Sequence, residues 1–241
     1  AGMLMGATAE KLVEKYSIAR EEQDEFALQS HQKAVNAMEK GYFKEEVLPL
    51  EVKVGKKIEI ADQEEIPRPD ASLEKMGKLP PVFKKDGTVT AGNSCALSDA
   101  ASAMVIMSEE KAKSLGAQPM AVIRSYAVAG VDPNYMGIGP VAAVPIALKK
   151  AGMTLDDIDL IELNEAFAAQ YIACERELKW DRDKVNVHGG AIALGHPVGA
   201  TGTKILTTLL YALRRYDKNV GLVSLCVGGG QGVAMIVERL S

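Results

Sequence analysis

A glycine-rich segment from Gly189 to Gly202 restricts the fold of this chain more than any other part of its sequence. The segment encloses an apolar run between glycines and presents one histidine, His196, between Gly195 and Pro197. Glycine adopts backbone angles that are closed to other residues, and proline fixes the chain beside it. Ordering so many glycines costs conformational entropy that an ordinary connection does not need to lose, but it allows the chain to orient an imidazole. We therefore predict that a tightly folded loop presents His196.

Two further segments combine a polar side chain with an unusual loop. Cys226 ends an apolar run and is followed by Val-Gly-Gly-Gly at 227–230, and Asn164 follows the apolar run 160–163. A core strand gains nothing from three glycines, which argues against a purely structural cysteine. In open α/β sheets, ligands bind beyond the carboxyl ends of the strands. We therefore expect Asn164, His196 and Cys226 to converge on one cleft.

Composition and charge exclude several classes of protein. Of the 241 residues, 47% are hydrophobic and 25% are charged, which is usual for a globular protein with a substantial core. The net charge of −4 argues against general binding to nucleic acid or to a membrane, because both need a basic face. The cysteines Cys95, Cys174 and Cys226 have the spacing of neither a disulfide framework nor a metal site. No metal is expected, and a reducing compartment, the cytoplasm, is favoured.

The first third of the sequence predicts one helix and then irregular structure. Apolar residues at helical spacing predict a helix over 21–40 that stops at Gly41. Residues 42–87 are rich in Lys, Glu and Pro, which is typical of loops. Short strands are predicted within them at 51–54 and 57–60.

Beyond residue 88, short apolar runs alternate with amphipathic helices. This alternation predicts a layered α/β fold with a mostly parallel sheet. The last two strands are joined by only seven residues and must form a hairpin or a switch between sheets. A further apolar run covers 101–107. The predicted strands are 121–128, 160–163, 185–187, 220–225 and 233–238, and the predicted helices are 109–115, 141–151, 166–178 and 203–215.

In their order and spacing, the three polar segments resemble the C-terminal signatures of the thiolases, the family of acetyl-CoA acetyltransferases and 3-ketoacyl-CoA thiolases. Weaker similarity at Met5-Gly6, 88–93 and 136–140 extends the resemblance over essentially the whole chain. It implies a layered thiolase-like fold with three parts. These are a loop-rich subdomain at 1–87 on the substrate side, the last elements of the N-terminal half at 88–118, and a complete C-terminal half at 119–241. The family pattern begins upstream of Ala1 and has its acyl-accepting nucleophilic cysteine there.

The resemblance also implies chemical roles. His196 would deprotonate the nucleophile or donate to the thioester oxygen, and Cys226 would move the α-proton as an acid/base. Asn164 would orient a water that forms one oxyanion hole with His196, and the N–H of Gly228 would contribute to a second. Backbone N–H groups after Cys226 would favour its thiolate. Two structural alternatives stay open, namely Cys226 as a buried apolar residue and Asn164 as a helix N-cap.

Implied substrate contacts lie outside these motifs. Arg68, between two prolines, aligns with an arginine that contacts the adenine end of CoA, and a solvated arginine is the alternative. Cys95 stands where the family usually has a pantetheine-binding serine, and its thiol is the weaker donor. Leu4 replaces a histidine of many biosynthetic members, which favours the degradative thiolases. The other implied contacts are Met5, Phe83, Ala91, Met136 and Phe167, whereas His31, His188 and Cys174 are predicted to be structural.

Together these observations predict part of a thiolase acyltransferase, which catalyses reversible thiolytic cleavage of 3-ketoacyl-CoA or Claisen condensation of acyl-CoA with acetyl-CoA. CoA thioesters are the expected substrates, and no cofactor is expected. An N-terminal thiolase segment or a companion chain would supply the nucleophile and pair with residues 101–107, and the complete enzyme would be a dimer or tetramer. One alternative is an inert CoA-binding or scaffolding subunit, which would need none of the three polar motif residues. Another is a different member of the ketoacyl-synthase-like superfamily, in which His or Asn typically replaces Cys226.

Overall fold

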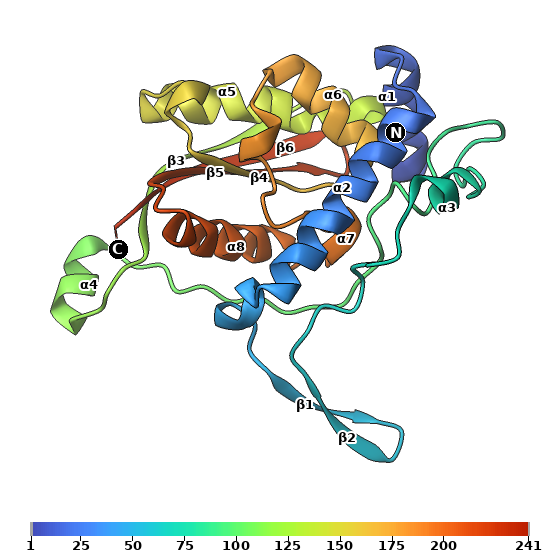
Figure 1. The fold of residues 1–241 in the computed structure, drawn as a ribbon. Coiled ribbons are helices and arrows are strands. Elements are labelled where there is room, and N and C mark those ends of the chain that lie inside the picture. Colours follow the sequence, from blue (N-terminus) through green and yellow to red (C-terminus); the bar gives the residue numbers. More distant parts are fainter. Residues whose placement is uncertain (1, 241) are drawn as a thin grey trace.

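The computed structural model describes residues 2–240, and its centre is a four-stranded sheet between two layers of helices (Figure 1). The strands lie in the order β3-β6-β5-β4. Helices α5 and α6 cover one face of the sheet, and α8 covers the other. The layered α/β prediction is confirmed. The bounds are β3 Ala121–Gly130, β4 Leu160–Leu163, β5 Val220–Val227, β6 Gln231–Arg239, α5 Gly139–Ala151, α6 Ala168–Leu178 and α8 Thr201–Arg215.

Alternating side chains along the strands build two apolar cores. Leu222 and Ile236 belong to the core beneath α5 and α6, whereas their neighbours Val223 and Val237 pack with α8. Successive side chains of a strand point to opposite faces, so β5 and β6 contribute to both layers. On α8, the apolar stripe includes the fully buried Leu209. The sheet is therefore held by apolar burial on both faces, which stabilises by about 25 cal/mol per Å².

The strand directions correct the expectation of a mostly parallel sheet. Strands β4 and β5 are parallel, but β6 runs antiparallel to both of its neighbours, β5 and β3. The predicted hairpin explains the difference, because residues 228–230 join β5 to β6 directly and are too few for a parallel crossover. Since β6 lies between β5 and β3, its return direction makes two of the three pairings antiparallel.

The strand predicted at 185–187 is wrong, because Val185 makes an isolated bridge to Ile161 in place of a strand pairing. The next residue, Asn186, has a φ of 47°, in the left-handed region that asparagine tolerates better than most residues. Its side-chain amide takes the place of backbone pairing. The Oδ1 atom accepts from the N–H of Leu163 and the Nδ2 atom donates to the carbonyl of Leu163, both at 2.9 Å.

The first third of the chain contains two long helices and a projecting hairpin. Helices α1 (Met5–Tyr16) and α2 (Arg20–Glu39) lie beside the sheet, and the predicted strands form the antiparallel pair β1 (Leu50–Val54) and β2 (Lys57–Ala61). All residues of β1 and β2 are exposed, and the hairpin extends away from the body (Figure 1). The shorter elements are α3 Leu73–Gly77, α4 Glu109–Leu115, α7 Ala191–Leu194, and the 3₁₀ helices Tyr42–Glu45, Pro133–Ile138, Leu155–Asp157 and Arg182–Lys184.

Residues 101–107, the apolar run that precedes α4, have no regular secondary structure. They lie in a long connection that passes below the sheet layer to α4 (Figure 1). Val105 and Ile106 are 81% and 67% exposed. Large apolar side chains clustered in water are typical of an interaction surface.

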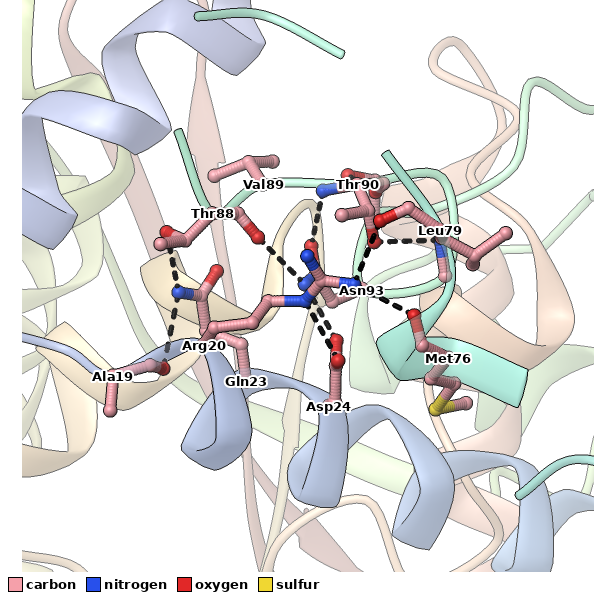
Figure 2. Close-up of polar contacts among 12 residues, drawn as sticks. Ala19, Arg20, Gln23, Asp24, Met76, Leu79, Thr88, Val89, Thr90 and Asn93 are labelled. Carbon is pink, nitrogen blue, oxygen red and sulfur yellow. Dashed lines mark hydrogen bonds and ion pairs between the residues drawn. The ribbon is translucent and has the colours of Figure 1, made fainter. Parts of the chain in front are cut away.

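A buried polar network holds the segment before residue 94 against α2 (Figure 2). Asn93 is fully buried, and its Nδ2 atom donates to Asp24 Oδ1 at 2.9 Å while its Oδ1 atom accepts from the N–H of Thr90 at 2.8 Å. The other Asp24 oxygen pairs with Arg20 at 2.7 Å. Arg20 also donates to the carbonyl of Met76 at 2.7 Å. The network therefore joins α2, the end of α3 and the segment that leads to the candidate site.

We predict that Asn93→Ala lowers the free energy of unfolding by about 2–4 kcal/mol, because it leaves the Asp24 carboxylate and the Thr90 N–H buried with fewer partners. Denaturant unfolding of the chain measures the change. Asn134→Ala is the matched control, since the Asn134 side chain bonds only on the exposed surface, to Asp132, and should change stability by no more than about 0.5 kcal/mol. Equal effects of the two substitutions would contradict the prediction.

Candidate active site

One extended segment, residues 93–97, ties two of the predicted motifs together. The N–H of Ala168 donates to the carbonyl of Asn93 at 2.9 Å, and the N–H of Cys95 donates to the carbonyl of Ala166 at 3.1 Å. Further along the same segment, the N–H of His196 donates to the carbonyl of Ala96 at 3.3 Å. The loop after Asn164 and the loop of His196 are therefore brought together by backbone hydrogen bonds to one strand-like segment.

The His196 imidazole is half-buried and fixed through its Nδ1 atom. Thr201 Oγ1 lies 2.7 Å from Nδ1, and the same hydroxyl donates to the carbonyl of Pro197 at 3.0 Å. Because the hydroxyl proton is engaged by Pro197, the arrangement favours a proton on Nδ1 and a free lone pair on Nε2. Burial and, secondarily, the charge of Lys204 lower the pKa of His196. A neutral imidazole with a free Nε2 can act as a base.

The glycine frame around His196 has a steric cause. Gly195 has a φ of 77°, and a Cβ there would overlap the Ser98 and Ile66 side chains. A Cβ on Gly190 would overlap the Glu165 carboxylate. The prediction that a tight loop presents His196 is confirmed, and α7 lies within that loop. His196 lines a cleft of about 660 Å³, whose other walls are residues 97–102 and 197–200.

Asn164 directly follows β4 and is 1% exposed. Its N–H donates to the carbonyl of Ser224 at 3.0 Å, but neither the oxygen nor the nitrogen of its side-chain amide has a partner. The N-cap alternative is wrong, because α6 begins at Ala168 and its N-cap is Phe167, without a side-chain cap. Buried amides are normally satisfied by protein or by ordered water. The unpartnered amide is thus suited to hold a water or a ligand atom.

Sequence reasoning missed the neighbouring Glu165, which is also 1% exposed. Its carboxylate accepts from Ser30 Oγ at 2.7 Å, from Asn186 Nδ2 at 2.8 Å and from the N–H of Ile192 at 3.2 Å. It therefore joins α2, the loop before the glycine segment and α7, and it stabilises the loops on which Asn164 and His196 lie. The available signal was an acidic residue directly after the motif asparagine, at the end of an apolar strand.

Cys226 lies near the end of β5 in an apolar cluster, and burial raises the pKa of its thiol to about 12. A backbone hydrogen bond lowers the pKa, as expected of nearby N–H groups, but burial is the larger cause and outweighs it. The reason is that β5 carries Cys226 into the protein, whereas the turn at Gly228 and Gly229 is exposed. Gly228 lies beside Met5, since a Cβ on Gly228 would be 3.6 Å from the Met5 sulfur. At neutral pH, Cys226 is a protonated thiol that can donate a proton.

The predicted substrate contacts fall into two groups. Around Cys226, the apolar cluster holds the four predicted pocket residues Met5, Phe83, Met136 and Phe167. The rings of Phe83 and Phe167 meet edge to face, with centroids 6.0 Å apart. Separately, Arg68 and Ala91 line a pocket of about 380 Å³ that also includes His31 and Lys75. Cys95 follows Ala91 in the chain and is half-buried, and burial raises its pKa to about 11.

The histidines and cysteine predicted to be structural are packed in the protein interior. His31 Nδ1 accepts from the N–H of Arg68 at 3.3 Å. His188 is 1% exposed among aromatic rings, and burial lowers its pKa to about 4. Cys174 is fully buried on α6. Within residues 2–240, no group of three or more His, Cys, Asp or Glu side chains is placed to hold a metal ion, and no helix has the length and apolar character to cross a membrane.

Cys226 packs in one apolar cluster with Phe167. Residues 93–97 join the loop that contains Phe167 to the loop of His196 by backbone hydrogen bonds. His196 lines the larger cleft, whereas Asn164 and Cys226 lie buried. A single cleft shared by all three side chains stays a prediction. The site is that of a layered α/β protein in which an unpartnered amide follows strand β4, a thiol lies near the end of β5, and an imidazole lies on the loop after α7.

Comparison with known protein families agrees with this architecture. The family model described as the thiolase C-terminal domain matches residues 117–239, and the thiolase N-terminal domain matches residues 1–110. The chain belongs to the thiolase family. The two models meet between 110 and 117, close to the boundary predicted at 118–119, although the predicted division into 1–87, 88–118 and 119–241 stays a prediction.

Individual relatives are similar over nearly all of the chain. It is 52% identical over 240 residues to an acetyl-CoA acetyltransferase of Escherichia coli K12 and 55% identical over 236 residues to one of Pseudomonas aeruginosa, covering 100% and 98% of this chain. It superposes on the crystal structure of the Bacillus anthracis acetyl-CoA acetyltransferase with a TM-score of 0.97 at 52% identity, covering 99% of this chain. For human mitochondrial 3-ketoacyl-CoA thiolase the TM-score is 0.92 at 48% identity over 98% of this chain.

The chain spans 60–61% of the length of these relatives and solved structures. The thiolase-like fold is therefore shown for the portion present.

Proposed function

We propose that this chain is the C-terminal portion of a thiolase acyltransferase that cleaves 3-ketoacyl-CoA with CoA or, in reverse, condenses acyl-CoA with acetyl-CoA. In this proposal the nucleophilic cysteine comes from sequence outside these 241 residues, and CoA thioesters are the substrates without a further cofactor. The observation that carries the proposal is the backbone connection through residues 93–97. That segment bonds to the loop after Asn164, whose Phe167 packs with Cys226, and to the loop of His196.

Each candidate residue has a chemical task in the proposed reaction. His196, with Nδ1 held by Thr201, accepts the nucleophile's proton at Nε2. The nucleophile's thiolate attacks the 3-keto carbon, and cleavage of the adjacent C–C bond leaves the acyl-enzyme and the enolate of acetyl-CoA. The Cys226 thiol donates its proton to the enolate carbon. The Cys226 thiolate then takes the proton of the CoA thiol, whose sulfur attacks the acyl-enzyme, and the released nucleophile takes its proton back from His196. Reversal of these steps gives the condensation.

Two groups would stabilise the negative oxygens that form along this path. The unpartnered, buried amide of Asn164 is suited to orient a water that, with His196, donates to the enolate oxygen. The N–H of Gly228, on the exposed turn beside Met5, is suited to the oxyanion of the tetrahedral intermediate. Removing one such donor typically costs about 10²–10³ in rate.

The proposed substrate path uses the two groups of predicted contacts. Arg68 and Ala91 lie at the pocket proposed for the nucleotide side of CoA, where His31 and Lys75 add polar lining. Met5, Phe83, Met136 and Phe167 surround Cys226 and would bind the acyl and pantetheine parts by apolar contact. Cys95 would face pantetheine as a weak donor. We also propose a cytoplasmic enzyme that is a dimer or tetramer when complete.

Joining the chain to the N-terminal portion of the Bacillus anthracis relative tests the proposal. We expect the fused protein to cleave acetoacetyl-CoA in the presence of CoA, and His196→Ala to lower kcat by about 10²–10⁴, the usual contribution of a positioned acid/base. A fusion in which the nucleophilic cysteine of the joined portion is replaced serves as the reference for complete loss of turnover. A folded fusion that binds CoA but shows no turnover would favour the alternative of an inert CoA-binding or scaffolding subunit.

A further inference from the structure

A lysine of α8 lies directly behind the His196 loop. Lys204 Nζ donates to the carbonyl of Leu194 at 2.6 Å and to the carbonyl of Gly195 at 3.2 Å. These are the two peptide carbonyls that precede His196 in the chain. Thr201, which holds the imidazole ring, lies three residues before Lys204 on the same face of α8. One helix therefore contacts both the ring of His196 and the backbone that leads to it.

The charge of this lysine interacts with acidic side chains whose own pKa values are raised by burial. Burial lowers the pKa of Lys204, and nearby acidic groups oppose that change. Glu46 accepts from Thr208, one turn further along α8, at 2.8 Å, but its other oxygen is buried without a partner. Burial raises the pKa of Glu46 to about 7. The carboxylates that act on Lys204 are Glu46, Glu64, Glu162 and Glu165.

A buried ammonium is costly unless hydrogen bonds and opposite charges compensate it. Lys204 makes its hydrogen bonds to the His196 loop, and no step of the proposed reaction uses its proton. The charge of Lys204 also acts on the imidazole. Burial is the larger cause of the lowered pKa of His196, and the charge of Lys204 is the second cause. An apolar side chain at this position of α8 would fill the same space at a lower desolvation cost. Only a donor such as lysine can also make the hydrogen bonds to the carbonyls of Leu194 and Gly195.

We propose that Lys204 is a positioning residue for His196. Its ammonium holds the Leu194 and Gly195 carbonyls and thereby the direction in which the loop presents the ring. Its positive charge disfavours a second positive charge on the imidazole, so that Nε2 keeps its lone pair at neutral pH. The effect of this positioning on catalysis rests on the proposed function, but the hydrogen bonds and the charge of Lys204 are features of this chain.

Nuclear magnetic resonance of the imidazole nitrogens tests the proposal with this chain isotope-labelled and in complex with the unlabelled N-terminal portion, because the labelled sequence contains only His31, His188 and His196. Three substitutions of Lys204 separate its two effects. Lys204→Met removes both the charge and the donors, Lys204→Gln keeps donors without the charge, and Lys204→Arg keeps both. Lys149→Met is the matched control, since Lys149 is an exposed lysine of α5, on the opposite face of the sheet.

We expect the titration midpoint of His196 to shift upward in Lys204→Met and Lys204→Gln and to stay near its original value in Lys204→Arg and Lys149→Met. The wild-type ring should be the Nδ1–H tautomer, and Lys204→Met should show a mixture. Amide exchange at His196, whose N–H bonds to Ala96, should become roughly tenfold faster in Lys204→Met and change less in Lys204→Gln.

An unchanged midpoint, tautomer and exchange rate in a folded Lys204→Met would overturn the proposal. If Lys204→Met does not fold, Lys204→Gln decides. An unchanged titration midpoint of His196 in Lys204→Gln would contradict the electrostatic effect of the lysine. An unchanged rate of amide exchange in that variant would mean that neutral donors are enough to hold the loop. These measurements need no enzymatic turnover. A positive result with an inactive fusion protein would therefore contradict the proposed function while leaving the positioning role of Lys204 in place.

Discussion

Replacing Cys226 by serine in the complete enzyme is expected to lower the rates of condensation and thiolysis by about 10²–10⁴, the range for loss of a positioned acid/base. In the proposed reaction, the thiol of Cys226 protonates the enolate carbon and its thiolate removes the α-proton in reverse. A serine hydroxyl is a much weaker acid than the thiol, even where burial raises the thiol pKa to about 12. The apolar cluster around residue 226 would also raise the cost of an alkoxide.

Acyl transfer from acetyl-CoA to the upstream nucleophile requires no α-proton transfer, so it should persist in part in Cys226→Ser. Rapid quenching followed by mass spectrometry measures the acyl-enzyme, and steady-state assays measure turnover. Cys174→Ala is the matched control, because Cys174 is a buried cysteine on α6 that packs in the main core. We expect it to keep turnover near that of the parent enzyme. If Cys226→Ser traps no acyl-enzyme and behaves like a variant without the nucleophile, the acid/base assignment is wrong.

The second large effect concerns residues 101–107. We propose that this segment pairs with strands of the polypeptide that carries the nucleophilic cysteine, and that the separated chains are inactive and poorly soluble. Val105 and Ile106 are 81% and 67% exposed, and the backbone around them has no regular pairing within residues 2–240. Unpaired extended backbone and exposed apolar side chains favour association. Native mass spectrometry or gel filtration of the two chains should show a tight complex.

Ile106→Glu should weaken that complex by more than about 100-fold, because burial of an unpaired carboxylate costs several kcal/mol. The same substitution should make the isolated chain more soluble. Ile58→Glu is the control, since Ile58 is 72% exposed on the projecting β1–β2 hairpin and should leave the complex intact. A stable, soluble and active monomer of this chain alone would contradict the proposal.

Local patterns in the sequence predicted most helices and strands, because their signals lie within each segment. The helical spacing in α2 and α8, the stop at Gly41 and the hairpin of β5 and β6 all appear in the structure close to the predicted bounds. Apolar alternation determines which side chains are buried, and a short connection determines that two strands are antiparallel. For the same reason, the sequence located Asn164 directly after β4 and Cys226 near the end of β5.

Contacts between distant segments decided the remainder. The position of β6 between β5 and β3, which makes the sheet mostly antiparallel, depends on strand order and leaves no local signal. Asn186 replaces a predicted strand because its amide finds Leu163, 23 residues earlier. Glu165 joins three elements only when Ser30 and Ile192 approach it. The raised pKa of Cys226 likewise follows from burial in a cluster assembled from several elements, since desolvation depends on every neighbour in space and not on neighbours in sequence.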